Sequence, residues 1–219
     1  SESNIHGIVC VPRHSNPTGH TFSDDNVEQL FKLIEPLKEN FSIFWDNAYA
    51  CHDIEDTIQQ TPADQIAKKI GLENNLFQVG STSKITLAGS GISFISSSAD
   101  NLSKFIDFRN AITPGPNKMN QGMHVKYFEL VSIEQQMSEL KKIIKPKLEL
   151  VDHILEPIKD TGLCFYEKPT GGYFITYSTS KPIATKVVEL CKDLGVLITP
   201  AGSTFPNNND PKDSVIRLA

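Results

Sequence analysis

Short apolar runs alternate with amphipathic stretches through the first half of the chain. This alternation is typical of β-α-β units, in which helices connect the strands of a mostly parallel sheet. The runs have the length of strands and are bounded by polar or turn-forming residues. We therefore expect four strands in this part, at residues 8–11, 42–45, 76–80 and 92–96.

A helix is predicted between the first two of these strands. Ser23 has the side chain of a good N-cap, and the two aspartates that follow it suit the positive N-terminal end of a helix. Pro36 is expected to kink or end the helix, because proline lacks the backbone N–H that a helix interior needs. The apolar residues at helical spacing between them are Val27, Leu30, Phe31 and Ile34.

The pattern becomes helical from residue 117 to about residue 159, where apolar residues recur at three- and four-residue steps. We expect a long connecting helix there, interrupted near Pro146. Beyond it, the pattern predicts a strand, a glycine turn at residues 171 and 172, a second strand, a helix and a third strand. Their ranges are 163–166, 173–177, 182–194 and 196–198.

Together these elements predict an α/β fold in two parts. Residues 1–131 are expected to form part of a large domain with a mostly parallel sheet. Residues 132–219 are expected to form the connecting helix and a smaller C-terminal α+β domain. The composition agrees, because 219 residues with 39% hydrophobic and 21% charged content can form one large or two small soluble domains.

Composition and charge argue against several classes of protein. No apolar run approaches the ~18 to 20 residues of a membrane span, and the N-terminal Ser-Glu-Ser-Asn does not resemble a secretory signal. A net charge of -5 with scattered lysines gives no surface for nucleic acid. The cysteines at positions 10, 51, 164 and 191 lack the spacing of a zinc site or a disulfide framework, so we expect buried free thiols in a reducing cytosol.

Polar and glycine-containing segments follow three of the predicted strands. They are residues 15–19, 46–49 and 80–84, and they hold most of the residues that could perform chemistry. In parallel α/β sheets, ligands bind at the carboxyl ends of the strands. We therefore expect the functional site at this edge of the sheet.

These segments resemble the cofactor-binding series of the fold type I pyridoxal-phosphate enzymes, and within them the class I/II aminotransferases. The motifs are Asn-Pro-Thr-Gly at 16–19, Asp-Asn-Ala-Tyr at 46–49 and Ser-Thr-Ser-Lys at 81–84. The ending Val-Ile-Arg-Leu-Ala at 215–219 resembles the substrate-carboxylate motif of that family. Each tetrapeptide alone is weak evidence, but four in this order identify the chain as similar to the C-terminal portion of a bacterial aspartate-aminotransferase-like enzyme.

The resemblance implies a catalytic role for Lys84, Asp46 and Tyr49. Lys84 would form an imine with the aldehyde of pyridoxal 5'-phosphate and then move a proton between the substrate Cα and the cofactor. Asp46 would keep the pyridine nitrogen protonated, so that the ring can withdraw electrons. Tyr49 and Asn16 would donate hydrogen bonds to the 3-oxygen of the ring.

Further residues are implied to bind the cofactor phosphate and the substrate. Ser81 and Ser83 would donate hydrogen bonds to the phosphate, Arg217 would hold the α-carboxylate of the substrate in a two-pronged pair, and Asn16 would also bind the substrate. The family commonly has an arginine eight residues after the lysine, yet that position here is Ile92. Ile92 directly follows the glycine-containing run 88–91. Backbone amides of that run, or residues outside the chain, would then have to hold the phosphate.

Several other residues have more than one interpretation. His52 and Asp53 suggest a metal-binding dipeptide, but no second His or Asp cluster has ligand spacing, which favours a surface or capping role. Arg13 and His14 could line the substrate pocket or position the loop that follows them. The segments 171–174 and 200–206 resemble strand and loop segments of the family's small domain. His124 and Tyr127 share one helical face and are expected in the core or at an interface.

The resemblance implies a cytoplasmic homodimer that transfers the amino group of an L-amino acid, favoured as aspartate or glutamate, to a 2-oxo acid such as 2-oxoglutarate. Family members are much longer than 219 residues, so we expect this chain to be a fragment that is inactive by itself. Two alternatives stay open. The chain could be the aminotransferase-like sensor domain of a transcription regulator, or a pyridoxal-phosphate-dependent lyase on the same scaffold.

Overall fold

A computed structural model describes residues 4–55 and 59–219. These residues form two compact units. The first comprises the described residues within Ser1–Pro12, Phe22–Ala50 and Ile58–Ser138, and the second those within Arg13–Thr21, Cys51–Thr57 and Glu139–Ala219. The units are interleaved along the sequence, because two loops from the first half of the chain pack with the C-terminal part. The domain division at residues 131 and 132 stays a prediction.

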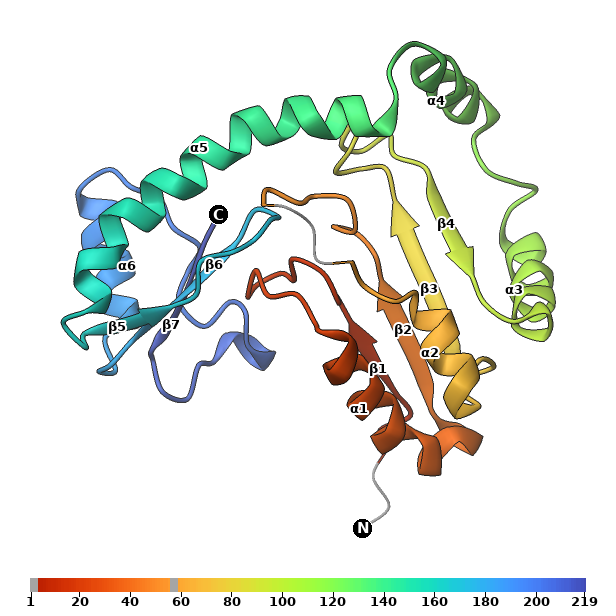
Figure 1. The fold of residues 1–219 in the computed structure, drawn as a ribbon, viewed down its shortest axis with the longest axis horizontal. Coiled ribbons are helices and arrows are strands. Elements are labelled where there is room, and N and C mark those ends of the chain that lie inside the picture. The colour runs from red at the N-terminus through yellow and green to blue at the C-terminus, as the bar shows by residue number, and fades with distance from the viewer. Residues whose placement is uncertain (1–3, 56–58) are drawn as a thin grey trace. The chain divides into compact units, whose positions relative to one another are not determined.

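The first unit is built on a mixed, mostly parallel sheet. Within the described residues, its four strands follow the order β1-β2-β3-β4, with the first three parallel and β4 antiparallel to β3 (Figure 1). The prediction of four strands and of the α/β fold class is confirmed. The strands are β1 (Gly7–Cys10), β2 (Ser42–Asp46), β3 (Leu76–Ser81) and β4 (Ser93–Ser96).

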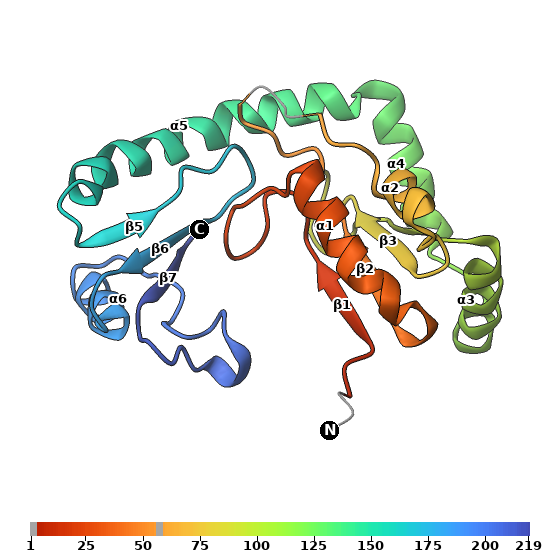
Figure 2. The same ribbon diagram turned by 60° about the horizontal axis from the view of Figure 1, so that its bottom comes forward.

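Helices α1 (Asp24–Ile34) and α2 (Ala63–Ile70) pack against one face of this sheet (Figure 2). Ser23 caps α1 as predicted, and the helix ends at Ile34, after which the 3-10 turn η1 (Glu35–Asn40) carries Pro36 near its start. The second helix is absent from the predicted elements. The side chains that form the core between helices and sheet include Phe31, Ile43, Trp45, Ala67 and Leu72.

The helical region after the sheet differs from its prediction. It contains α3 (Ala99–Ile112), α4 (Lys118–Leu130) and α5 (Ile133–Lys159), and α5 runs through Pro146 without ending. The interruption lies instead at Ser132, whose hydroxyl accepts a hydrogen bond from the Gln135 N–H at 3.1 Å and so begins a new helix. An interruption near Pro146 was therefore the wrong expectation.

The sheet of the second unit is antiparallel. Its described strands are β5 (Cys164–Tyr166), β6 (Ile175–Thr179) and β7 (Val215–Leu218), in that order, and α6 (Ala184–Asp193) lies beside β7 (Figure 1). A short 3-10 turn, η2 (Pro206–Asn208), precedes β7.

The predicted strand at 196–198 is wrong. Residues 196–198 lie outside regular structure, and Leu197 is 83% exposed. An apolar run forms a strand only where a neighbouring strand and a buried face receive it, and β7 occupies the place beside β6. Among the described helices, none is long and apolar enough to cross a membrane.

Candidate functional site

The carboxyl ends of β2 and β3 lie side by side in the first unit. Asp46, the last residue of β2, pairs with Val79, and β3 continues to Ser81. The N–H of Asn47 donates a hydrogen bond to the Val79 carbonyl at 2.8 Å, so the loop after β2 starts along the end of β3. Asp46 and Ser81 are therefore at the same edge of the sheet, as the strand pattern predicts.

The loop after β2 holds the Asp46 carboxylate in place. Its Oδ1 accepts a hydrogen bond from the Ala48 N–H at 2.9 Å, which closes a turn onto its own backbone. Tyr49 follows this turn and is 6% exposed. The turn thus orients a partly buried carboxylate just before a buried tyrosine.

Lys84 lies in a turn that begins where β3 ends. The Ile85 and Thr86 N–H groups donate to the Thr82 carbonyl, both at 2.8 Å. The Ser83 N–H donates to the Ser81 hydroxyl at 3.1 Å, and the two serine hydroxyls are 2.9 Å apart. Lys84 itself is on the exposed side of the turn. Two hydroxyls and an amine therefore lie within one short segment.

Ile92 closes this turn from the other side. Its N–H donates to the Thr82 hydroxyl at 2.9 Å, and its carbonyl accepts from the Thr82 N–H, also at 2.9 Å. A side-chain carbon at Gly91 would overlap Ser83, so only glycine permits this close approach. The backbone of residue 92, where the family commonly has an arginine, thus shapes the turn that carries Lys84.

Helix α4 braces the same turn from behind. His124 is 6% exposed, and its Nε2 lies 3.1 Å from the Thr82 hydroxyl and 2.9 Å from the Thr86 hydroxyl. Its Nδ1 is 2.9 Å from the Asn120 carbonyl, which can only accept, so Nδ1 carries a proton.

A second brace comes from the start of α5. Gln136 donates to the Ile85 carbonyl at 3.0 Å and accepts from the Tyr127 hydroxyl at 2.6 Å. The sequence suggests only a core or interface role for His124 and Tyr127. A histidine or tyrosine on a helix carries no signal for a turn located 40 residues earlier.

In the second unit, the structure brings Asn16 and Arg217 together. The Arg217 guanidinium donates through NH1 to Asn16 Oδ1 at 2.9 Å and through NH2 to the Thr199 hydroxyl at 3.0 Å. Its Cζ lies 5.0 Å from the centre of the Phe174 ring. The Nε atom is buried and has no hydrogen-bond partner among the described residues. Arg217 is thus oriented by contacts on two sides of its guanidinium.

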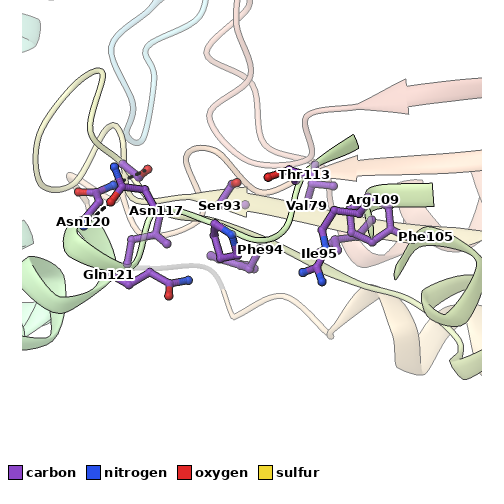
Figure 3. A pocket seen from close by; sticks show the side chains of 14 residues that line it. Val79, Ser93, Phe94, Ile95, Phe105, Arg109, Thr113, Asn117, Asn120 and Gln121 are labelled. Carbon is purple, nitrogen blue, oxygen red and sulfur yellow. Dashed lines mark hydrogen bonds between the residues drawn. The ribbon is translucent and has the colours of Figure 1, made fainter. Parts of the chain in front are cut away.

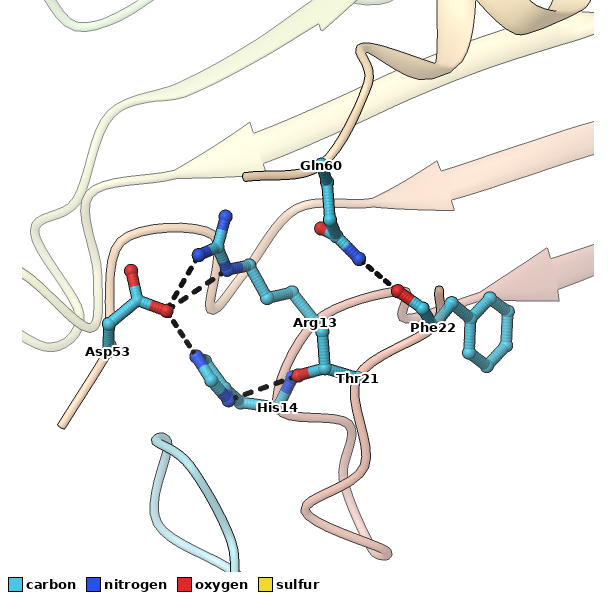
Figure 4. Close-up of polar contacts among 6 residues, drawn as sticks. All are labelled: Arg13, His14, Thr21, Phe22, Asp53 and Gln60. Atoms are coloured by element: carbon cyan, nitrogen blue, oxygen red, sulfur yellow. Dashed lines mark hydrogen bonds and ion pairs between the residues drawn. The ribbon is translucent and has the colours of Figure 1, made fainter. Parts of the chain in front are cut away.

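Arg13, His14 and Asp53 also meet in the second unit (Figure 4). The Asp53 carboxylate takes an ion pair from Arg13 at 2.7 Å and a contact from His14 Nε2 at 2.9 Å. Within the described ranges, no group of three or more His, Cys, Asp or Glu residues could hold a metal ion. These contacts favour the capping and loop-positioning interpretations of the residues.

A cavity of about 620 Å³ opens in the first unit between β3, β4, α3 and α4 (Figure 3). Phe94, Ile95 and Phe105 give it an apolar wall, while Arg109 and Asn120 are among its polar residues. No predicted site residue is among those that line it. The cavity nevertheless adjoins the sheet edge that carries Asp46 and Ser81, because Val79, which pairs with Asp46, and Ser93, which pairs with Ser81, both line it.

The whole chain, residues 1–219, matches the family model described as aspartate amino-transferase. It is 39% identical over 223 residues to a protein of Mycolicibacterium smegmatis that is provisionally named an aminotransferase, covering 100% of this chain and 52% of that protein. It is 35% identical over 218 residues to an aspartate aminotransferase of Corynebacterium glutamicum, covering 98% and 50%.

A crystal structure of an aspartate transaminase from Corynebacterium glutamicum has the same fold, with a TM-score of 0.89 at 35% identity. The match covers 97% of this chain and 51% of that one. The chain thus spans about half the length of the curated relatives it matches.

Proposed function

Because the chain belongs to the aspartate aminotransferase family, we propose that the protein transfers the amino group of an L-amino acid to a 2-oxo acid, with pyridoxal 5'-phosphate as cofactor. The observation that carries this proposal is the sheet edge at which Asp46 lies beside the turn of Ser81, Ser83 and Lys84. The favoured substrates are aspartate or glutamate with 2-oxoglutarate, and the favoured assembly is a homodimer.

The groups at this edge suit the cofactor chemically. When bound, pyridoxal 5'-phosphate supplies an aldehyde that captures amines and a ring that withdraws electrons from the substrate. The Lys84 amine lies on the exposed side of its turn, where it can reach an aldehyde. Asp46 is held by one oxygen at the Ala48 N–H, and its carboxylate would pair with the basic ring nitrogen of the cofactor.

The serine hydroxyls offer donors for the phosphate group. The Ser81 and Ser83 hydroxyls lie 2.9 Å apart and share a hydrogen bond, and both could turn their hydrogens to one phosphate in its place. Because Ile92 brings no positive charge, neutral donors of this turn would take a larger share of the phosphate than in relatives with an arginine there. Tyr49 and Asn16 are proposed to donate to the ring oxygen.

Arg217 is proposed to hold the α-carboxylate of the substrate. Its guanidinium is positioned by Asn16 and Thr199, and its Nε has no hydrogen-bond partner among the described residues. A planar guanidinium can bind a carboxylate through two parallel hydrogen bonds, which fixes the orientation of the substrate. Lys84 would then take the proton from the substrate Cα and return one to the cofactor side, its amine being the only base that this proposal requires.

Absorption spectra of the full-length protein test the proposal. Bound cofactor should absorb at roughly 360 to 430 nm, and L-aspartate should shift that band to the pyridoxamine form. Lys84→Ala should remove the covalently held band while the fold is retained, whereas Lys104→Ala, an exposed lysine of α3, should leave it unchanged. An unchanged band in Lys84→Ala would refute the assignment. Release of ammonia without transfer to the 2-oxo acid would indicate a lyase instead.

A further inference from the structure

Arg13, His14, Thr21 and Asp53 form a partly buried polar group, here named the His14 cluster (Figure 4). Arg13 donates to Asp53 Oδ1 through Nε at 3.2 Å and through NH2 at 2.7 Å. His14 Nε2 lies 2.9 Å from the same oxygen, and its Nδ1 lies 3.3 Å from the Thr21 hydroxyl. The cluster joins both ends of the loop 13–21 to the segment that contains Asp53.

The hydrogen-bond pattern defines how the histidine is held. A carboxylate oxygen only accepts, so His14 Nε2 donates to Asp53. The Thr21 hydroxyl oxygen accepts from the His14 backbone N–H at 3.1 Å, which leaves its hydrogen to donate to Nδ1. His14 is 1% exposed and has a φ of 47°, a backbone conformation that costs a non-glycine residue on the order of 1 kcal/mol. Such strain persists only where the surroundings hold the residue firmly.

The ring of His14 also packs on the glycine turn before β6. A side-chain carbon at Gly171 would lie 2.5 Å from His14 Nε2, and one at Gly172 would lie 2.7 Å from His14 Cβ. The Gly172 N–H donates to the His52 carbonyl at 2.9 Å. The two glycines thus allow three backbone segments to meet around one imidazole.

From this turn, the chain leads to Arg217. Thr176 of β6 pairs with Arg217 of β7, and the Thr176 hydroxyl donates to the Pro17 carbonyl at 2.9 Å. The loop 13–21 is therefore held by the His14 cluster at its two ends and by β6 in its middle. Asn16, which accepts from Arg217, lies next to the residue held by Thr176.

We propose that the His14 cluster is a positioning device for the substrate carboxylate: it holds the loop 13–21 so that Asn16 keeps Arg217 oriented. This inference rests on the proposed function of Arg217. The contact between Asn16 and Arg217 is exposed, so by itself it is too weak to order a loop. If the loop is ordered before substrate binds, substrate binding does not have to supply the free energy of ordering it, which is the general benefit of preorganisation.

The test compares Asp53→Asn in the full-length protein with wild type. L-aspartate is titrated against the cofactor absorption, and steady-state rates are measured alongside. We expect an apparent Kd and KM for L-aspartate raised about tenfold, as for the loss of one charged hydrogen bond, with kcat and the cofactor band nearly unchanged. Glu167→Gln is the matched control, because it removes the exposed His20 contact of the same loop at 3.1 Å and should leave Kd unchanged.

A double-mutant cycle separates positioning from general destabilisation. If the cluster acts through Arg217, Asp53→Asn should weaken binding less than about twofold in an Arg217→Lys background. Equal losses in both backgrounds, or no loss in either, would overturn the inference. If Asp53→Asn does not fold, Thr21→Val carries the test, since it removes only the hydroxyl that holds His14. If wild type itself gives no response to L-aspartate or L-glutamate, the proposed function fails and this inference falls with it.

Discussion

Replacing His124 by alanine tests whether the brace behind Lys84 supports the site. The substitution removes one acceptor shared by Thr82 and Thr86 and one donor to the Asn120 carbonyl. It also removes a buried ring whose centre lies 6.1 Å from that of Phe128. Both stability and cofactor binding should therefore respond.

The loss of unfolding free energy in His124→Ala depends on which hydrogen bonds the former partners of His124 keep. A buried group left without a partner costs about 1 to 3 kcal/mol, which would suggest a large loss for three partners. However, the Thr82 hydroxyl still accepts from Ile92, and the Thr86 hydroxyl can turn its one hydrogen to the Thr82 carbonyl, which lies 3.1 Å away. We therefore expect roughly 2 kcal/mol from hydrogen bonding and about 1 kcal/mol from lost packing, or ~3 kcal/mol in total.

Urea unfolding of the full-length protein measures the free energy, and dialysis followed by absorption measures cofactor release. His124→Ala should lower the midpoint and release cofactor faster, because the turn that carries Lys84 loses its support. His153→Ala, an exposed histidine of α5, is the control and should change stability by less than about 0.5 kcal/mol. A His124→Ala protein that is destabilised but retains cofactor like wild type would refute the link between brace and site.

Three further predictions concern packing inside each of the two units. Phe31→Ala, at a fully buried position between α1 and the sheet, should lower the free energy of unfolding by about 3 to 5 kcal/mol in a denaturant titration. Burial, with the Asp152 hydrogen bond, raises the pKa of Tyr166 to about 12 from 10.0, so the folded state keeps this proton longer than the unfolded state. Its stabilisation is present below pH 10 and is lost as pH rises toward 12, by on the order of 2 kcal/mol, and Tyr166→Phe should flatten that part of the stability curve. Gly172→Ala, at a φ of 71° against His14 Cβ, should lower the melting temperature and also weaken L-aspartate binding, whereas Gly162→Ala, at the same φ but with open space around it, should affect stability alone.

The sheet and its edge could be predicted from sequence because they depend on local patterns. Apolar runs such as Ile43 to Trp45 are short and bounded, and a strand that carries a ligand residue at its end leaves a recognisable motif such as Asp46 to Tyr49. Ser23 likewise indicates the start of α1, because its own side chain forms the N-cap. In each case the deciding residues lie within a few positions of one another.

The errors came where distant residues decide. Residues 196–198 have the pattern of a strand, yet β7 is the strand that pairs with β6, and only the tertiary fold settles which segment takes that place. The helix continues through Pro146, and its start is fixed instead by the hydrogen bond from the Gln135 N–H to Ser132. The partners of Asp53 lie about 40 residues earlier, so no local signal could separate a metal ligand from an anchor for Arg13 and His14.

The proposed chemistry is divided between the two units, which lets its parts be tested separately. Asp46, Ser81 and Lys84 belong to the first unit and depend on the brace from His124. Asn16 and Arg217 belong to the second unit and depend on the His14 cluster. Substitution of His124 should therefore alter cofactor retention. Substitution within the His14 cluster should alter the affinity for the substrate carboxylate while the cofactor stays bound. A His124 variant that changed only substrate affinity, or a His14-cluster variant that released cofactor, would contradict this division of roles.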